Sequence, residues 1–212
     1  MTAVDLDVDL DRGIDALGIA LDARQRKQLH DYLALLAKWN KTYNLTAIRD
    51  PARMVTHHAL DSLAVLPHLP STRSLRVLDV GSGGGLPGIP IAVARPDWRV
   101  VMVDPVHKKA AFLTQAAIEL GLHNATSHAT RVEDLRGEAP FDIVISRAFA
   151  DLATFARASS PHLAPHGVLV AMKGVLPVDE IAALDGAYQV DSIPLHVPGL
   201  PAERHLVFMR SP

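Results

Sequence analysis

The chain has 212 residues, 49% of them hydrophobic and 21% charged, a composition typical of globular proteins that excludes a disordered chain. It contains no cysteine, so disulfides, thiolate metal sites and cysteine nucleophiles are excluded as well. The formal net charge of −2 argues against a protein that holds nucleic acid by overall attraction, so an RNA contact would need a local basic face.

The N-terminus and the apolar segments indicate where the protein works. Residues 1–12 alternate acidic and aliphatic side chains and lack the basic region and apolar run of a secretory signal. No apolar segment is long enough to span a bilayer. We therefore expect a cytoplasmic protein that does not contact a membrane.

The first 70 residues are predicted to be helical. Asp22 followed by Gln25 is a capping-box signal, and Asp50-Pro51 is a second helix start with proline at the first helical position. After Asp22, apolar residues recur at helical spacing at Leu29, Tyr32, Leu33, Leu36 and Trp39. We expect residues 1–70 to form a helical extension that precedes a domain of different character.

The stretch from Leu75 to Pro90 is the most informative part of the chain. Apolar residues lead into Asp79, four glycines follow within five positions, and an apolar run with prolines comes next. This pattern predicts a strand, a tight loop and a helix. Glycines in such a loop remove the β-carbons that would keep a ligand away, and the free amides at the helix start then face that ligand.

Three kinds of ligand loop compete for this stretch. A phosphate-binding P-loop needs Lys followed by Ser or Thr after its last glycine, whereas Gly88 is followed by Ile-Pro. A dinucleotide fingerprint fits Gly83, Gly85 and Gly88, but its first glycine should come directly off the strand, where Gly81 stands. The remaining pattern, Asp79-x-Gly81-x-Gly83-x-Gly85, resembles the cofactor loop of class I S-adenosylmethionine-dependent methyltransferases. There the three glycines would admit the methionine end of the cofactor, and Asp79 would attract its ammonium group or hold the loop amides.

Strands and helices alternate through the rest of the chain. Strands are expected at residues 98–104, 123–129, 141–146, 168–172, 188–194 and 205–209, and helices at residues 108–120, 151–163 and 177–184. The alternation implies a parallel sheet with helices on both faces, while the last two strands should form an antiparallel hairpin because no helix fits between them. Residues 165–167, Pro-His-Gly, are expected to be a turn. We therefore predict an α/β fold of the class I methyltransferase (Rossmann-like) type over residues 71–212.

Asp104 ends the second expected strand, about 20 residues beyond the glycines. A carboxylate at that place can accept hydrogen bonds from both hydroxyls of an adenosine ribose. A dinucleotide fold would place an acid there too. Asp104 thus indicates an adenosine cofactor without deciding which one.

Seven short motifs, in order along the chain, narrow the resemblance to one family. They are Trp39-Asn40 with Asn44-Leu45-Thr46-Ala47-Ile48, His58-x-x-Asp61-Ser62-Leu63, the glycine stretch, Lys108-Lys109-x-x-Phe112-Leu113, Arg131-x-Glu133, Ser146-Arg147-Ala148-Phe149-Ala150 and Lys173-Gly174. Together they resemble the bacterial ribosomal RNA small-subunit methyltransferase G family, also called glucose-inhibited division protein B. The resemblance implies transfer of a methyl group from S-adenosylmethionine to N7 of one guanine in 16S ribosomal RNA, either as naked RNA or within the small ribosomal subunit.

The resemblance also implies which residues meet the cofactor. They are Gly81 and Leu86 in the loop, Val132 and Glu133 after the third strand, and Arg147 after the fourth. For Glu133 the family motif carries the assignment, because an acid in this segment would otherwise be read as an ordinary surface carboxylate.

The reaction implied by the resemblance asks little of side chains. Guanine N7 carries a lone pair and no proton, so its attack on the methyl group needs alignment rather than a general base. We hypothesise that Arg147 or Lys173, at the carboxyl ends of expected strands, orients the base or its phosphate. An equally weighted alternative for Arg147 is an ion pair that closes its loop, with Glu133 as a candidate partner.

Two further possibilities stay open from the sequence. His57, His58 and Asp61 have helical spacing, but with no other ligand in view we expect a helix face that contacts RNA or the methyltransferase domain, and no metal site. The acceptor of the methyl group could be another molecule. The glycine loop with Asp104 would also suit a non-catalytic or NAD-dependent nucleotide-binding domain.

Overall fold

Seven strands form one sheet in the order β3-β2-β1-β4-β5-β7-β6 in the computed structural model, which describes residues 3–71 and 74–211. The strands are β1 (Arg76–Val80), β2 (Arg99–Val103), β3 (Ala125–His128), β4 (Phe141–Arg147), β5 (Leu163–Lys173), β6 (Gln189–Pro194) and β7 (His205–Arg210). Strands β1 to β5 pair in parallel, whereas β7 runs antiparallel to both β5 and β6. The predicted parallel sheet with a terminal antiparallel hairpin is confirmed.

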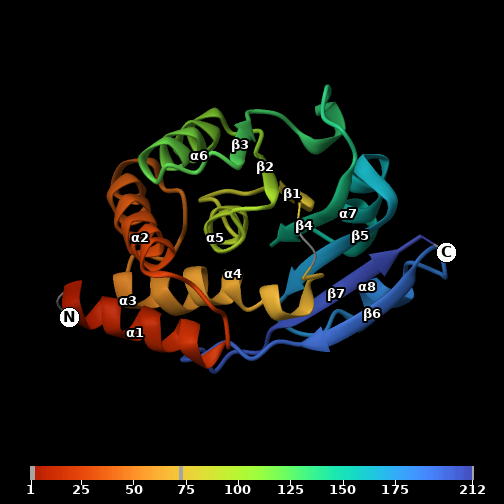
Figure 1. The fold of residues 1–212 in the computed structure, drawn as a ribbon. Coiled ribbons are helices and arrows are strands. Elements are labelled where there is room, and N and C mark those ends of the chain that lie inside the picture. Colours follow the sequence, from red (N-terminus) through yellow and green to blue (C-terminus); the bar gives the residue numbers. More distant parts are fainter. Residues whose placement is uncertain (1–2, 72–73, 212) are drawn as a thin grey trace.

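Helices cover both faces of this sheet (Figure 1). They are α1 (Ala3–Ala16), α2 (Ala23–Tyr43), α3 (Pro51–Met54), η1 (Val55–Leu60), α4 (Asp61–Leu63), η2 (Leu66–His68), α5 (Gly88–Ala94), α6 (His107–Glu119), η3 (Val132–Asp134), α7 (Leu152–Ser159), η4 (Ser160–His162) and α8 (Val178–Ala182). Side chains of α2, η1, α5 and α6 share one buried cluster with one face of the sheet. Those of α7 pack with the opposite face. The helices before residue 70 therefore share a core with the sheet, and the boundary between two domains at that point stays a prediction.

Local sequence signals begin two of these helices as expected. The Gln25 amide donates to Asp22 Oδ1 at 2.8 Å, and the Asp22 amide donates to Gln25 Oε1 at 2.9 Å, which completes the capping box of α2. The Ala52 amide donates to Asp50 Oδ1 at 3.0 Å, with Pro51 at the first position of α3. Each cap satisfies an amide that has no acceptor within its own helix.

The helix that follows Asp50 is not regular throughout. Its middle part, η1, is a π-helix, and regular α-helical bonding resumes only at α4. π-Helical turns are rare and are frequently found at functional sites. In this chain the π turn carries His57 and His58 and leads directly into Asp61.

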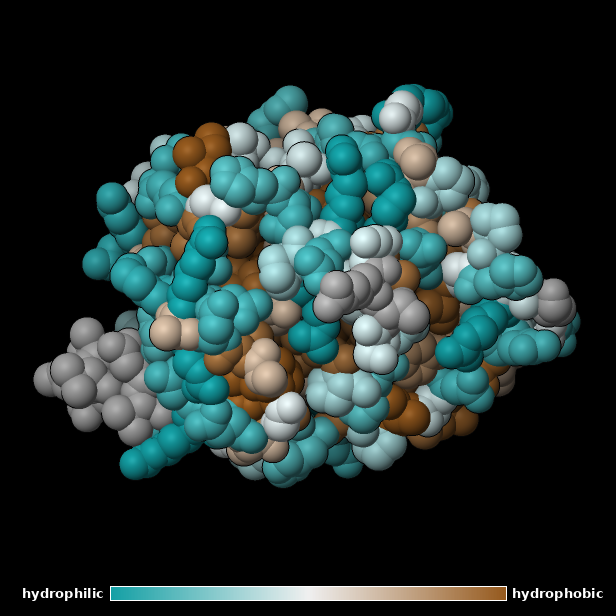
Figure 2. All heavy atoms as spheres, in the orientation of Figure 1, coloured by the Kyte–Doolittle hydropathy of each residue, from teal (hydrophilic) through white to brown (hydrophobic). Residues whose placement is uncertain are grey.

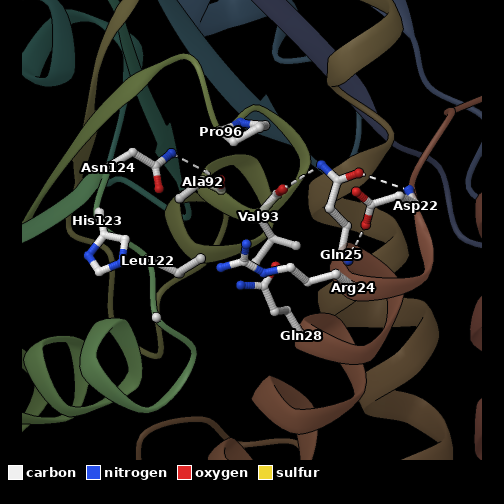
Figure 3. A pocket seen from close by; sticks show the side chains of 11 residues that line it. Asp22, Arg24, Gln25, Gln28, Ala92, Val93, Pro96, Leu122, His123 and Asn124 are labelled. Carbon is white, nitrogen blue, oxygen red and sulfur yellow. Dashed lines mark hydrogen bonds between the residues drawn. The ribbon is translucent and has the colours of Figure 1, made fainter.

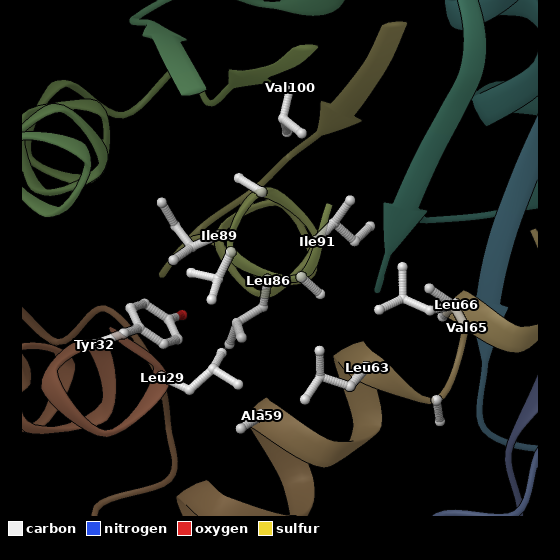
Figure 4. Packing of buried hydrophobic residues seen from close by; sticks show 14 of the residues in the cluster. Leu29, Tyr32, Ala59, Leu63, Val65, Leu66, Leu86, Ile89, Ile91 and Val100 are labelled. Atoms are coloured by element: carbon white, nitrogen blue, oxygen red, sulfur yellow. The ribbon is translucent and has the colours of Figure 1, made fainter. Parts of the chain in front are cut away.

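Tyr32 links α2 to the glycine loop through the buried core. Its side chain is 0% exposed, and its hydroxyl donates to the Gly84 carbonyl at 2.6 Å. Figure 4 shows the ring beside Leu29 and Leu86, with Ile89 of α5 close by. This packing places the helical segments against the loop that follows β1.

One expectation about the chain is wrong. Residues 165–167, expected to form a turn, lie within β5, where the pairing with β4 shifts register between Phe141 and Ile143. His166 has a φ of 66° there. Such a bulge accommodates extra residues without ending the strand, so Pro-His-Gly marks an irregularity in β5 rather than its beginning.

The face of the molecule in Figure 2 is predominantly polar, and hydrophobic side chains are exposed there in separate areas. Within residues 3–71 and 74–211, no helix combines the length and the apolar character that crossing a membrane requires.

We predict that Tyr32→Phe lowers the free energy of unfolding by about 1 to 3 kcal/mol, because the buried Gly84 carbonyl loses its donor. Tyr43→Phe removes a hydroxyl from a side chain that is 41% exposed and should change stability by less than about 0.5 kcal/mol. Urea unfolding of both variants measures the difference. Equal stability of Tyr32→Phe and wild type would contradict the prediction.

Candidate functional site

The glycine loop leaves β1 at Gly81, whose φ of 71° suits a residue without a β-carbon. The loop ends at Gly88, whose amide donates to Asp79 Oδ2 at 2.9 Å. A β-carbon on Gly88 would lie 2.7 Å from Asp79 Oδ2 and 2.7 Å from Met102 Cγ, so another residue would fit only if these two side chains moved. The carboxylate of Asp79 therefore holds the start of α5 against β1.

Asp79 is fully buried, and only one of its carboxylate oxygens is occupied. Burial raises the pKa of Asp79 to about 7, although the Gly88 amide and the Ser82 hydroxyl act in the opposite direction. Within the described part of the chain, Oδ1 has no hydrogen-bond partner. A buried acceptor without a donor is uncommon in proteins, and the raised pKa reflects this environment.

Asp104 lies at the end of β2, where the sequence predicts a ribose-binding carboxylate. Its Oδ2 accepts from the Gly83 amide at 3.0 Å and lies 3.5 Å from Lys109 Nζ. Its Oδ1 accepts from the Val106 amide at 2.9 Å. Asp104 thus fixes the glycine loop to the second strand, and its contact with a ribose stays a prediction.

A cavity of about 220 Å³ opens beside the glycine loop at the carboxyl ends of β1 and β2. Three residues predicted to meet the cofactor, Gly81, Val132 and Glu133, line it together with Phe149. Leu86 lies apart from this cavity, because its side chain is 3% exposed and points into the core between α2 and α5 (Figure 4).

A second cavity, of about 450 Å³, lies at the carboxyl ends of β4 and β5. It brings together motifs that are far apart in the sequence. Its lining residues are Thr46, Ala47, Ile48, His57, His58, Asp61, Arg147, Ala148, Met172, Lys173, Gly174 and Arg204. We call it the polar cavity.

Arg147 and Lys173 both line the polar cavity, and each is held by a carboxylate. Arg147 Nη1 donates to Asp61 Oδ2 at 3.1 Å and to the His57 carbonyl at 2.8 Å. The ion pair suggested for Arg147 is therefore present, but its partner is Asp61 and the suggested partner Glu133 is wrong. Lys173 Nζ donates to Glu180 Oε2 at 2.8 Å and to Oε1 at 3.1 Å.

A hydrogen-bond network that joins Asn40, Thr46 and His58 shapes one wall of the polar cavity. The Nδ1 atom of His58 lies 2.9 Å from the His57 carbonyl, so it carries the proton, and Nε2 accepts from the Thr46 hydroxyl at 2.8 Å. Asn40 Oδ1 accepts from the Thr46 amide at 2.8 Å. Burial and the Arg147 charge lower the pKa of His58 to about 4. His58 is therefore a neutral structural link rather than a proton carrier.

A third cavity, of about 480 Å³, lies between the start of α2 and the loop after α6 (Figure 3). Its residues Pro96 and Asn124 stand just before β2 and β3, at the amino ends of these strands. Ligands of doubly wound sheets bind at the opposite edge. We therefore place the candidate site at the two cavities on the carboxyl edge.

Sequence reasoning missed the partners of several site residues. Asp61 Oδ1 also accepts from Arg204 Nε at 2.8 Å, and these two residues are 143 positions apart. Tyr32 meets Gly84 across 52 positions. No spacing in the sequence indicates which carboxylate Arg204 meets.

We predict that Asp79→Asn changes how stability depends on pH. Folding raises the pKa of Asp79 from 3.8 to about 7. The folded protein thus holds a proton between these values that the unfolded chain has released. The contribution of Asp79 to the free energy of unfolding therefore falls as pH rises from about 4 to about 7, by up to about 1.4 kcal/mol per pH unit. We expect urea unfolding at a series of pH values to show this: the free energy of unfolding of wild type minus that of Asp79→Asn falls across this range.

The prediction compares two proteins because His58 also makes the free energy of unfolding depend on pH. Its lowered pKa makes stability rise with pH between about 4 and 6.5, opposite to the effect of Asp79. Both proteins contain His58, so its effect cancels in the subtraction. A difference that is flat or rises with pH would refute the assignment to Asp79.

Solved structures with this arrangement of sheet and helices include several methyltransferases. A precorrin-6Y C5,15-methyltransferase from Geobacter metallireducens matches with a TM-score of 0.56 at 16% identity, over 71% of this chain and 87% of that one. Aeropyrum pernix fibrillarin with natively bound S-adenosyl-L-methionine matches with a TM-score of 0.55 at 16% identity, over 71% of this chain and 73% of that one. These likenesses confirm the predicted class I methyltransferase fold.

Sequence comparison defines the family. The profile of rRNA small subunit methyltransferase G matches residues 25–207. The ribosomal RNA small subunit methyltransferase G of Ralstonia nicotianae is 54% identical over 208 residues, 95% of this chain and 93% of that protein. Its namesake from Nitrosospira multiformis is 51% identical over 207 residues, 93% of this chain and 94% of that protein. The chain therefore belongs to the rRNA small subunit methyltransferase G family of S-adenosylmethionine-dependent methyltransferases, as its motifs predicted.

Proposed function

We propose that this enzyme transfers a methyl group from S-adenosylmethionine to N7 of one guanine in 16S ribosomal RNA. The observation that carries the proposal is the loop after β4. Ala148 of this loop lines the polar cavity, and the neighbouring Phe149 lines the cavity beside the glycine loop. Ala148 has a φ of 64°, a conformation that residues with a β-carbon rarely adopt outside functional or tightly constrained sites. One short loop thus separates a pocket for the methyl donor from a pocket for the acceptor.

The cavity beside the glycine loop is our proposed donor pocket. Gly81 borders this pocket and lets the cofactor approach the main chain, while Gly83, Gly85 and the buried Asp79 belong to the proposed set through the loop that they shape behind it. Val132 and Glu133 border the same pocket and would face the adenine end. Asp104, Leu86 and Arg147 complete the proposed set. Asp104 acts toward the ribose, Leu86 holds the loop, and Arg147 would reach the cofactor from the polar cavity, across the loop after β4.

The polar cavity is our proposed acceptor pocket. Guanine N7 attacks as a lone pair, so the chain has to align the base and needs no group to remove a proton. Arg147 offers hydrogen-bond donors toward O6 or a phosphate, which leaves the N7 lone pair free to attack, and Lys173 offers a point charge on the same rim. These two residues are our candidates for orienting the acceptor.

The helical extension, residues 1–70, has a defined part in this proposal. It supplies one wall of the acceptor pocket through Thr46, His58 and Asp61, while residues 71–212 supply the donor pocket. The acceptor is 16S ribosomal RNA, alone or within the small subunit, and the reaction therefore belongs to the cytoplasm.

Calorimetry and a methyl-transfer assay test the proposal. We expect S-adenosylmethionine to bind and NAD not to bind. With labelled cofactor, methyl transfer to 16S ribosomal RNA or small subunits should be found at a guanine N7 by mass spectrometry of nuclease fragments. NAD binding, or a methyl group on another atom or molecule only, would overturn it.

We predict that Arg147→Ala lowers the rate of methyl transfer roughly 100-fold, the effect of misplacing a reactant. Arg157→Ala changes an arginine of α7 that does not line either site cavity and should leave the rate unchanged. Initial rates with saturating S-adenosylmethionine measure both variants. Unchanged transfer and cofactor binding in Arg147→Ala would exclude Arg147 from the site.

A further inference from the structure

A buried carboxylate joins two arginines at the polar cavity. The Asp61 side chain is 3% exposed, and it accepts from Arg147 Nη1 through Oδ2 and from Arg204 Nε through Oδ1. The three residues come from the start of α4, the end of β4 and the segment before β7. They meet only in the folded chain.

The charges of this cluster do not balance. Two guanidinium groups share one carboxylate, so within the described residues one positive charge beside the cavity has no directly bonded carboxylate of its own. The neighbouring pair on the rim, Lys173 and Glu180, is balanced. Among the described residues that line the cavity, the arginine pair is therefore the place where an anion would gain most.

The two guanidinium groups also have donors left for a ligand. Arg147 makes both of its protein contacts through Nη1. Arg204 uses Nε for Asp61 and Nη1 for the Glu203 carbonyl. Each guanidinium has five N–H groups, so Nη2 of both arginines remains available in the described structure. Their side chains are 21% and 22% exposed, which leaves them accessible from the cavity.

Both arginines are held in place before a ligand arrives. Arg147 is tied to the His57 carbonyl, and the Arg204 carbonyl accepts from the Leu195 amide at 2.7 Å. A planar donor group that is already fixed loses little freedom when it binds an anion.

We propose that Arg147 and Arg204, held as a pair by Asp61, bind a backbone phosphate of the RNA strand that enters the acceptor pocket. A phosphodiester carries one negative charge, equal to the unbalanced charge of the cluster, and guanidinium groups bind phosphate oxygens through paired hydrogen bonds. The inference rests on the proposed function. It adds Arg204 as an RNA-binding residue and Asp61 as a positioning residue.

Steady-state kinetics and RNA binding with Arg204→Gln test the proposal. We expect the KM for RNA to rise about tenfold, as for one lost charge-assisted contact, while kcat and S-adenosylmethionine affinity stay close to wild type. The slope of log Kd for RNA against log salt should fall by about 0.7 to 1. Arg210→Gln is the matched control, because Arg210 stands at the other end of β7 and pairs with the exposed Asp191.

A second variant separates phosphate binding from a purely structural role. Arg204→Lys keeps the charge that Asp61 needs, but its single nitrogen is taken by that contact. We expect Tm to be retained and KM for RNA to rise. If Arg204→Gln and Arg204→Lys change only Tm, the cluster is a structural link and the inference is overturned.

Failure of the proposed function would look different. A wild-type enzyme that transfers no methyl group to ribosomal RNA contradicts the proposed function. A wild-type enzyme that does so while the Arg204 variants keep its KM and salt slope contradicts only the phosphate site.

Discussion

The buried carboxylate of Asp79 is the constraint on which the carboxyl edge of the sheet, where both site cavities lie, depends. It sits at the end of a central strand and accepts from the amide that begins α5, so the glycine loop has fixed ends. Tyr32 holds the middle of the loop from the other side. Because the loop is held between a sheet and a helix, its backbone keeps one path beside the cavity. The amides of Gly81 and Ser82 themselves donate to the Val103 carbonyl, and the Gly83 amide donates to Asp104.

The second site depends on ion pairs that connect distant parts of the chain. Asp61 joins the helical segment to β4 and to the segment before β7, and Glu180 joins the end of β5 to the start of α7 through the Leu152 amide. Buried ion pairs contribute little net stability but restrict which arrangements are allowed. The ion pairs therefore restrict the shape of the polar cavity, although its rim is exposed to solvent.

Much of this architecture could be predicted because its signals are local. The capping box of Asp22, the proline after Asp50 and the alternation of strands and helices each act within a few residues. The bulge in β5 could not be recognised, because Pro-His-Gly also suits a turn. The partner of Arg147 could not be found either. Glu133 lies near it in sequence, whereas Asp61 is brought close only by the way the helical segment crosses the sheet edge.

The π turn at Val55–Leu60 has a consequence for variation in chain length. Each residue of an α-helix advances the direction of the side chains by about 100°. A π-helix turns less per residue, so the six residues of this turn rotate about as far as five residues of an α-helix. Deleting one residue here would therefore let regular α-helical bonding run through while α3 and α4 keep their facing. Met54 would stay in the core and Asp61 would stay on its arginines, but the cavity wall that carries His57 and His58 would be rebuilt with one residue fewer.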